Sequence, residues 1–324
     1  MDFGVSTLSR GVFVTREAYL ETAKAAERAG FGFMAVNDHV IVPASLGSAY
    51  PYTQGGQWAA AEHGHCFDQL ATLGFLSGCT SRLRLLSSIM VVPHRPAIQT
   101  AKMLATIDVL SGGRLILGVG SGWMKEEFGL LGAPFEDRGR ATDEYIEAFK
   151  ELWTKDRPAY SGRHVNFADV IFAPKPVQKP YPPIWVGGES PAALRRTIKL
   201  GDCWYPGNNS QTKPLDTPAR LGAAIAHLHG KAEAAGRDPA SVDVCLLIQN
   251  PFDWTAQKIA DGSARRLFTG SSADMAADAA ALEAWYAAGP NRVQSASQAS
   301  VRYFGTSSMR FSATAFSIFS ISST

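Results

Sequence analysis

The sequence predicts an α/β fold, and more narrowly a (β/α)8 barrel. Strand-like and helix-like segments alternate over most of the 324 residues, which is typical of parallel βαβ units. No single nucleotide-binding half stands out, and segments of unusual composition follow several different strands. In a barrel such segments meet at one face, where the active site lies.

The first part of the chain alternates regularly. The sequence predicts a helix that Thr15 caps and that Gly30 ends. Tyr19 and Ala23 share one face of this helix, and glycine commonly terminates helices. A long loop rich in Gly, Pro, Tyr and His follows the second strand. The expected strands are Asp2–Ser6, Phe31–Val36, Leu83–Val92 and Arg114–Gly118, and the further helices are Phe67–Gly78 and Ala97–Leu110.

The second part resumes this alternation after an interruption. Tyr145, Phe149 and Leu152 have helical spacing within Arg138–Trp153, which indicates an amphipathic helix. Residues 154–183 are rich in Pro and Tyr and are interpreted as an insertion with a short hairpin around Ala159–Asn166. The elements expected after it are the strands Ile184–Gly187, Cys203–Tyr205 and Val242–Gln249 and the helices Pro191–Leu200, Pro214–Ala235 and Ala273–Ala288.

The C-terminal end differs from the rest of the chain. Residues 289–324 contain ten serines among 36 residues and no Asp, Glu or Lys, and a regular strand–helix unit is not recognisable there. The strand candidates are Val301–Phe304 and Ala315–Phe319. We therefore predict a barrel domain over residues 1–288 and an atypical Ser-rich tail over residues 289–324. This tail replaces the last βα unit and is either irregular or supplies part of strand 8.

Charge and composition exclude several classes of protein. The net charge of +2 comes from 31 basic and 29 acidic residues, and three arginines of the tail account for the excess. The body is close to neutral, so nucleic acid is not an expected partner. No run of eighteen apolar residues predicts a membrane span, and the N-terminus is unlike a signal peptide. The cysteines are widely spaced, as expected of reduced thiols in a cytoplasmic protein: they are Cys66, Cys79, Cys203 and Cys245.

Two strand ends carry candidate polar groups. Asp38 and His39 follow the second strand. An adjacent carboxylate could fix the tautomer of His39 and make it a usable proton donor, and the alternative is a loop histidine beside a solvated aspartate. Ser87 and Ser88 interrupt an apolar strand. Their small size leaves room for a flat ligand or a bulge, unless both only bond to the backbone.

Two glycine-rich turns and one histidine pair complete the candidate groups. In Gly118–Gly122 the backbone could approach a ligand closely, although the spacing is not the dinucleotide-binding fingerprint and a plain tight turn is the alternative. Gly187–Pro191 joins a strand to a helix whose free amides could bind phosphate, or could form a cap without a ligand. The pair His63 and His65 lacks the further ligands of a metal site, so no metal is expected.

The order of these motifs resembles the bacterial luciferase-like superfamily of flavin- and deazaflavin-dependent oxidoreductases, and most closely its coenzyme F420-dependent branch. The resemblance covers roughly residues 1–285 and implies a TIM barrel with a tricyclic cofactor at the carboxyl ends of the strands. It is carried by Ala25–Phe31, Asn37–His39, Ala105–Arg114, Gly118–Trp123, Ala173–Gln178 and Pro183–Gly188.

The resemblance also implies roles for individual residues. Asp38 and His39 would lie beside the cofactor ring as catalytic residues, with His39 as proton donor. A non-prolyl cis peptide bond would join Ser88 and Ile89 and support the ring. Trp123 stands where sugar-phosphate dehydrogenases of the superfamily carry Glu, which disfavours that activity. The implied cofactor-binding residues are Ser88, Ile89, Gly120, Ser121, Gly122, Gly187, Gly188, Glu189 and Ser190.

The leading hypothesis is an oxidoreductase that moves a hydride between F420 and an apolar organic substrate. Tyr50, Trp58 and Trp123 would shape the substrate pocket under the long second loop. One alternative is an FMN-dependent monooxygenase of the same fold, which would react with oxygen. An alternative of another class is a non-catalytic protein whose altered C-terminus leaves the barrel incompletely closed. Related barrels often dimerise, so a homodimer is also an expectation.

Overall fold

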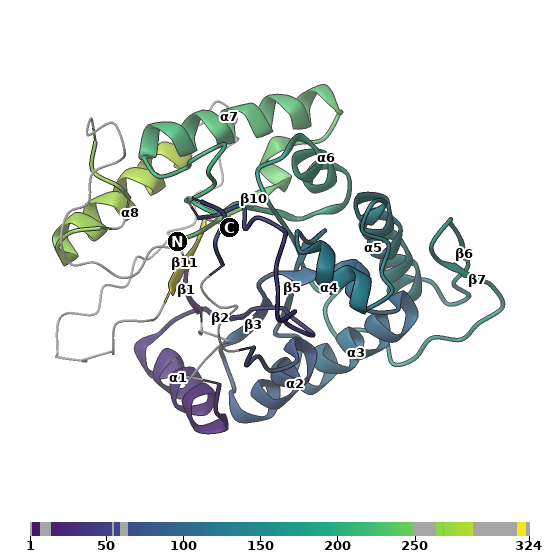
Figure 1. Ribbon diagram of the computed structural model, residues 1–324. Helices are drawn as coiled ribbons and strands as arrows, with labels where there is room; N and C mark the ends of the chain where they lie inside the picture. Colours follow the sequence, from purple (N-terminus) through teal and green to yellow (C-terminus); the bar gives the residue numbers. More distant parts are fainter. Residues whose placement is uncertain are drawn as a thin grey trace.

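The computed structural model describes residues 2–6, 14–53, 55–58, 64–248, 264–267, 269–287 and 316–321. Helices surround a curled, mostly parallel sheet, as expected of the α/β barrel (Figure 1). The sheet contains β1 (Asp2–Ser6), β2 (Phe33–Val36), β3 (Arg84–Ser87), β4 (Met90–Val91), β5 (Leu115–Gly120), β8 (Ile184–Gly187), β9 (Cys203–Tyr205), β10 (Asp243–Leu247) and β11 (Phe316–Ile321). The helices are α1 (Arg16–Ala29), α2 (Gln69–Cys79), α3 (Ala97–Leu110), α4 (Lys125–Leu130), α5 (Arg138–Thr154), α6 (Pro191–Leu200), α7 (Pro218–Ala234) and α8 (Ser272–Ala287), with 3-10 turns at Val92–His94 and Pro239–Ser241.

The strand pairings form a closed ring. Strands β1, β2, β3, β5, β8, β9 and β10 follow one another as parallel neighbours. Strand β11 is antiparallel and lies between β10 and β1, where Phe3 pairs with Phe319 and Leu246 pairs with the same residue from the other side. Figure 1 shows β11 beside β1, although the two are at opposite ends of the chain. The eighth position is thus filled by an antiparallel strand within the Ser-rich tail. The remaining residues of this tail, 289–315 and 322–324, lie outside the described part, and the division into a barrel and a tail stays a prediction.

Side chains alternate between the inside of the barrel and the helix layer, as barrel strands require. In β2, Met34 and Val36 belong to the large cluster that packs against the helices, whereas Phe33 and Ala35 belong to a separate inner cluster. The other members of the inner cluster are Leu86, Ile116, Trp185, Cys203, Tyr205 and Cys245. By the same alternation Gly118 and Gly120 of β5 and Gly187 of β8 face inward, near the carboxyl ends of their strands.

Two elements differ from expectation. The strand predicted over Leu83–Val92 is divided into β3 and β4, because Ser88 and Ile89 leave the sheet and are joined by a cis peptide bond, as the resemblance implied. Helix α4 was not predicted, since its six residues are too few for a clear periodicity. The insertion 154–183 carries the hairpin of β6 (Tyr160–Ser161) and β7 (Asn166–Phe167) near the predicted position, and it projects from the barrel (Figure 1).

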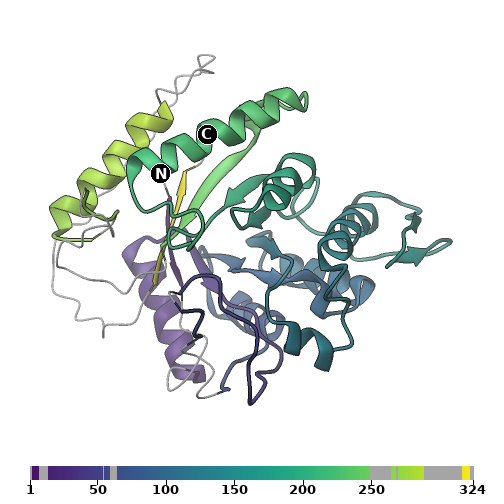
Figure 2. The same cartoon turned by 45° about the horizontal axis from the view of Figure 1, so that its top comes forward.

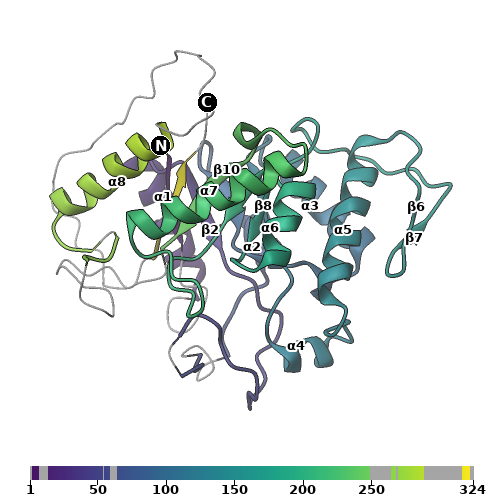
Figure 3. The same cartoon turned by 90° about the horizontal axis from the view of Figure 1, so that it is seen from above.

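The connections that follow the strands gather at one end of the barrel. Turning the molecule shows the ring of helices around the sheet (Figure 2). Seen from above, α4 and the loop after β2 lie at the same end (Figure 3). This is the face where barrel enzymes place their reactive groups. Among the described helices, none is long and apolar enough to cross a membrane.

Candidate active site

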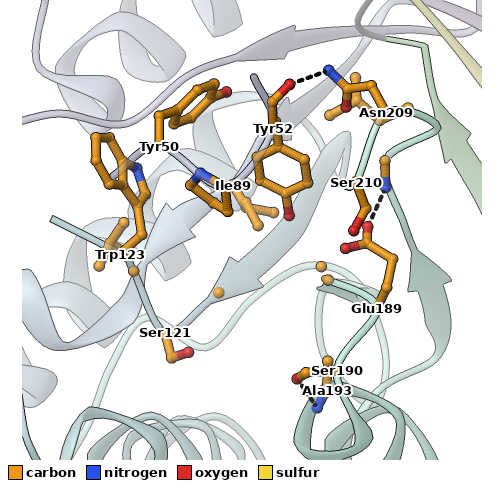
Figure 4. A pocket seen from close by; sticks show the side chains of 18 of the residues that line it. Tyr50, Tyr52, Ile89, Ser121, Trp123, Glu189, Ser190, Ala193, Asn209 and Ser210 are labelled. Atoms are coloured by element: carbon orange, nitrogen blue, oxygen red, sulfur yellow. Dashed lines mark hydrogen bonds between the residues drawn. The ribbon is translucent and has the colours of Figure 1, made fainter. Parts of the chain in front are cut away.

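A cavity of about 1340 Å³ opens at the carboxyl ends of the strands. Its lining includes residues that follow most of the barrel strands, and all fourteen residues predicted for the site are among them. These are Asp38, His39, Tyr50, Trp58, Ser88, Ile89, Gly120, Ser121, Gly122, Trp123, Gly187, Gly188, Glu189 and Ser190. Figure 4 shows Tyr50 and Trp123 on one side and Glu189 and Ser190 on the other, with Ile89 between them.

The bulge between β3 and β4 forms the middle of the cavity wall. A Cβ atom on Gly120 or Gly187 would lie 2.8 or 2.3 Å from Cδ1 of Ile89, and one on Gly118 would lie 2.0 Å from the carbonyl oxygen of Ser87. These inward-facing glycines therefore make room for the bulge itself. Gly120 also lines the cavity, so its predicted close approach to a ligand stays a prediction.

Ser87, at the end of β3, and Ser88, in the bulge, have protein partners. Ser87 donates from its hydroxyl to the carbonyl oxygen of Gly118 at 2.9 Å, so the backbone-bonding alternative is correct for it. The hydroxyl of Ser88 is 2.9 Å from that of Tyr205, which also lines the cavity. The backbone N–H of Ser88 donates to the carbonyl oxygen of Val36. The bulge is thereby tied to β2, β5 and β9.

His39 is held by a carboxylate distant in sequence. Its Nδ1 is 2.8 Å from Oε2 of Glu127, whose side chain is fully buried. The other oxygen of Glu127 accepts hydrogen bonds from the backbone N–H groups of Val40 and Ile41. Helix α4 therefore fixes both the imidazole and the start of the loop that carries it.

Asp38 does not orient His39, which corrects the sequence-based interpretation of this pair. Its carboxylate accepts two hydrogen bonds from the guanidinium of Arg95, at 2.8 and 2.9 Å, and one from the N–H of Val91. Consecutive side chains of an extended segment point in opposite directions. Asp38 thus anchors the strand just after the bulge, while His39 turns toward α4.

Aromatic rings form the wall beside His39. The ring of Trp58 lies 4.5 Å from that of His39 and 5.8 Å from that of Trp123. Tyr50 packs edge-on against both Trp123 and Tyr52. The described lining residues between Ala49 and Trp58 carry no charge. This side of the cavity is suited to an apolar ligand.

The opposite side is the amino end of α6. Ser190 caps this helix by accepting a hydrogen bond from the N–H of Ala193, and Gly188 before it has a φ of 100°, which favours glycine. Arg138 and Lys213 also line this part. Within the described chain Arg138 has no carboxylate partner and donates to the carbonyl oxygens of Gly122 and Phe135. Free N–H groups at a helix start and two cations are suited to an anion.

Glu189 links this side to the loop that carries the aromatic wall. Its carboxylate accepts a hydrogen bond from the N–H of Gly207 at 2.6 Å and further ones from Ser210 and Tyr52. Burial raises the pKa of Glu189 above its usual value, and burial together with Glu189 raises the pKa of Tyr52. Tyr52 therefore stays protonated and donates. Glu189 therefore positions Gly207 and Tyr52 at this side of the cavity, and its predicted role in cofactor binding stays a prediction.

No metal centre is found in the described ranges, since none of their His, Cys, Asp and Glu side chains form a group of three that could hold an ion. His65 is exposed. His63 lies outside the described residues, so the interpretation of this pair stays a prediction.

Three contributors were missed by the sequence interpretation. Glu127 follows the turn after β5, so a carboxylate just beyond a strand end was the available signal. Arg95 follows the bulged strand in the same way. Tyr52 lies in the long loop, where nothing in the sequence distinguishes it from its neighbours.

Comparison with known proteins identifies a family and relatives that are similar in sequence or in fold. The family described as luciferase-like monooxygenase matches residues 1–303. An uncharacterised protein of Mycobacterium tuberculosis is 33% identical over 219 residues, which cover 68% of this chain and 73% of that protein. The FMNH2-dependent dimethylsulfone monooxygenase of Pseudomonas putida is 38% identical over 138 residues, or 42% of this chain and 38% of that enzyme. The F420-dependent tetrahydromethanopterin reductase of Methanopyrus kandleri has a similar fold, with a TM-score of 0.57 and 21% identity over 75% of this chain and 64% of that chain.

Proposed function

The chain belongs to the luciferase-like monooxygenase family, and from this premise we propose that it transfers a hydride between coenzyme F420 and a neutral, apolar organic substrate. The family consists of oxidoreductases that act on small molecules. The observation that carries the proposal is His39, which lines the cavity beside an uncharged aromatic wall and is backed by a buried carboxylate. A cytoplasmic location and a homodimer remain expectations.

The residues present fit a tricyclic cofactor with a phosphate-bearing side chain. Ile89 projects from the bulge between the aromatic wall and the amino end of α6 (Figure 4), so it is placed to support a flat ring system. Gly188, Ser190, Arg138 and Lys213 would hold the anionic part. When bound, a deazaflavin supplies two-electron hydride chemistry.

The protein's own part is to orient the substrate, exclude water and move a proton. Trp58 and Trp123 offer apolar surface to the substrate. Removing or adding a hydride at carbon leaves a proton to be moved at the attached oxygen or nitrogen. His39 lies against the aromatic wall, where its ring packs against Trp58. It would take up or give that proton as general base or acid.

FMN-dependent monooxygenation is the second candidate. The observation that favours it is the identity of 38% to an enzyme named as FMNH2-dependent, over a segment of 138 residues. The same anion-binding residues would serve FMN. The two candidates therefore differ in the cofactor that the cavity retains.

The variant His39→Ala tests the proposed function. His39 is proposed to transfer the proton, so kcat should fall by about 10²- to 10⁴-fold. It is not proposed to bind the anionic part of the cofactor, so the Kd for the cofactor should change only a few-fold. Steady-state kinetics and a cofactor titration measure the two effects separately. An unchanged kcat would remove His39 from this role.

A further inference from the structure

We propose that Glu127, rather than Asp38, is the positioning residue of this site, and that it determines which ring nitrogen of His39 carries the proton. The inference rests on the proposed role of His39 in the proposed function. It adds a residue from α4, which lies outside the motifs that the sequence suggests.

The hydrogen bonds around Glu127 define the protonation of His39. Oε1 of Glu127 accepts from the N–H groups of Val40, at 2.7 Å, and Ile41, at 3.2 Å, which leaves Oε2 for His39. Burial alone would raise the pKa of Glu127, but the hydrogen bond and charge of His39, the charge of His94 and the hydrogen bond from the N–H of Val40 together lower it. An ionised carboxylate only accepts, so Nδ1 of His39 must donate. Nε2 is then the nitrogen left to exchange a proton with the substrate.

None of the described charged groups nearby competes for the hydrogen bond between His39 and Glu127. Nδ1 of His94 lies 3.9 Å from Oε1 of Glu127, too far for a hydrogen bond. Burial lowers the pKa of His94, so it is neutral near pH 7. Arg95 is engaged by Asp38 and Asp68. On α4 itself, the preceding Glu126 faces Gly47 and Ser48, and Lys125 faces Glu136.

The variant Glu127→Gln should reverse the tautomer without loss of the fold. The two backbone N–H groups need an acceptor at the position of Oε1, so the amide oxygen of glutamine must lie there. Its NH2 group then faces Nδ1 of His39 and donates to it. His39 is forced to accept at Nδ1 and to carry its proton on Nε2.

Glu126→Gln is the matched control. Oε1 of Glu126 also accepts from two consecutive backbone N–H groups, those of Gly47 and Ser48, and Glu126 precedes Glu127 on the same helix. The same exchange of carboxylate for amide is therefore made beside the same loop, but away from His39. This variant should keep the wild-type tautomer and the wild-type kcat.

The experiment is ¹⁵N NMR of the histidine rings in the cofactor-free wild type and both variants, above neutral pH, with His39→Ala used to assign the signal. We expect the proton on Nδ1 in the wild type and in Glu126→Gln, and on Nε2 in Glu127→Gln. A proton on Nε2 in the wild type, or no change in Glu127→Gln, would overturn the inference.

Kinetics of the same variants separate this inference from the proposed function. Glu127→Gln should lower kcat by about 10²-fold or more, because the reversed tautomer changes the protonation of Nε2, the nitrogen that exchanges a proton with the substrate. Its KM should change little. A reversed tautomer with unchanged kcat would contradict the proposed role of His39 and leave the assignment of Glu127 as the tautomer-determining residue supported.

Discussion

His94 is a buried histidine beside the site whose ring nitrogens have no hydrogen-bond partner in the described part of the chain. Burial lowers its pKa, although Glu127 and Asp38 act in the opposite direction. In the window between this lowered pKa and the unfolded value of about 6.5, the unfolded chain binds more protons than the native one. The free energy of unfolding should therefore fall as the pH drops below about 6.5.

The variant His94→Leu should weaken this pH dependence, because it removes the titrating group and leaves an apolar side chain against Phe128, whose ring lies 4.5 Å from that of His94. The difference between wild type and variant should reach at most about 1.4 kcal/mol for each pH unit in this window. Urea unfolding at pH 7.5 and 5.5 measures it. Equal pH dependence in the two proteins would refute the assignment.

At the scale of residues, the sequence is sufficient to predict a site residue when that residue belongs to one continuous motif. His39, Ser190 and the turn Gly187–Gly188 could be predicted to line the site because each lies at or just after the end of a strand. The partner of His39 could not, since Glu127 is separated from it by 88 positions and only the fold brings them together. A neighbour in sequence, Asp38, was therefore given a role that belongs to a neighbour in space.

At the scale of elements, the bulge between β3 and β4 explains the glycines of β5 and β8. The segment Leu83–Val92 was predicted as one strand, because its apolar pattern is nearly continuous and the register of a bulge is not visible in hydrophobicity. The sequence is enough to single out these inward-facing glycines as unusual. It does not show which side chain fills the space beside them. That side chain is Ile89.

Gly118→Ala should destabilise the protein, because its Cβ would lie 2.0 Å from a backbone carbonyl oxygen that cannot rotate away. We expect a loss of about 3 kcal/mol in the free energy of unfolding. Gly74→Ala in α2 is the control. No atom lies within 4 Å of its added Cβ, so it should stabilise the helix by about 0.5–1 kcal/mol. Denaturant unfolding of both variants checks the pair, and equal effects would contradict the packing argument.

At the scale of the whole molecule, the alternation of strands and helices was enough to predict the barrel. Its closure was not predictable, because the expected eighth unit is a parallel strand followed by a helix, whereas β11 is antiparallel and lies in a Ser-rich segment. The strand candidate Ala315–Phe319 overlaps β11, but only the pairings with β1 and β10 show where it belongs. A closed ring opposes the alternative of an incompletely closed, non-catalytic barrel.

We propose that this closed barrel binds a deazaflavin at the carboxyl ends of its strands. Titration of the purified full chain with F420 and with FMN, followed by absorbance and by thermal unfolding of the same samples, tests this binding. We predict saturable F420 binding and a single unfolding transition whose Tm rises with F420, since ligand at 100 times its Kd adds about 2.7 kcal/mol to stability. Tight FMN binding without F420 binding, or a Tm that neither cofactor changes, would contradict the account.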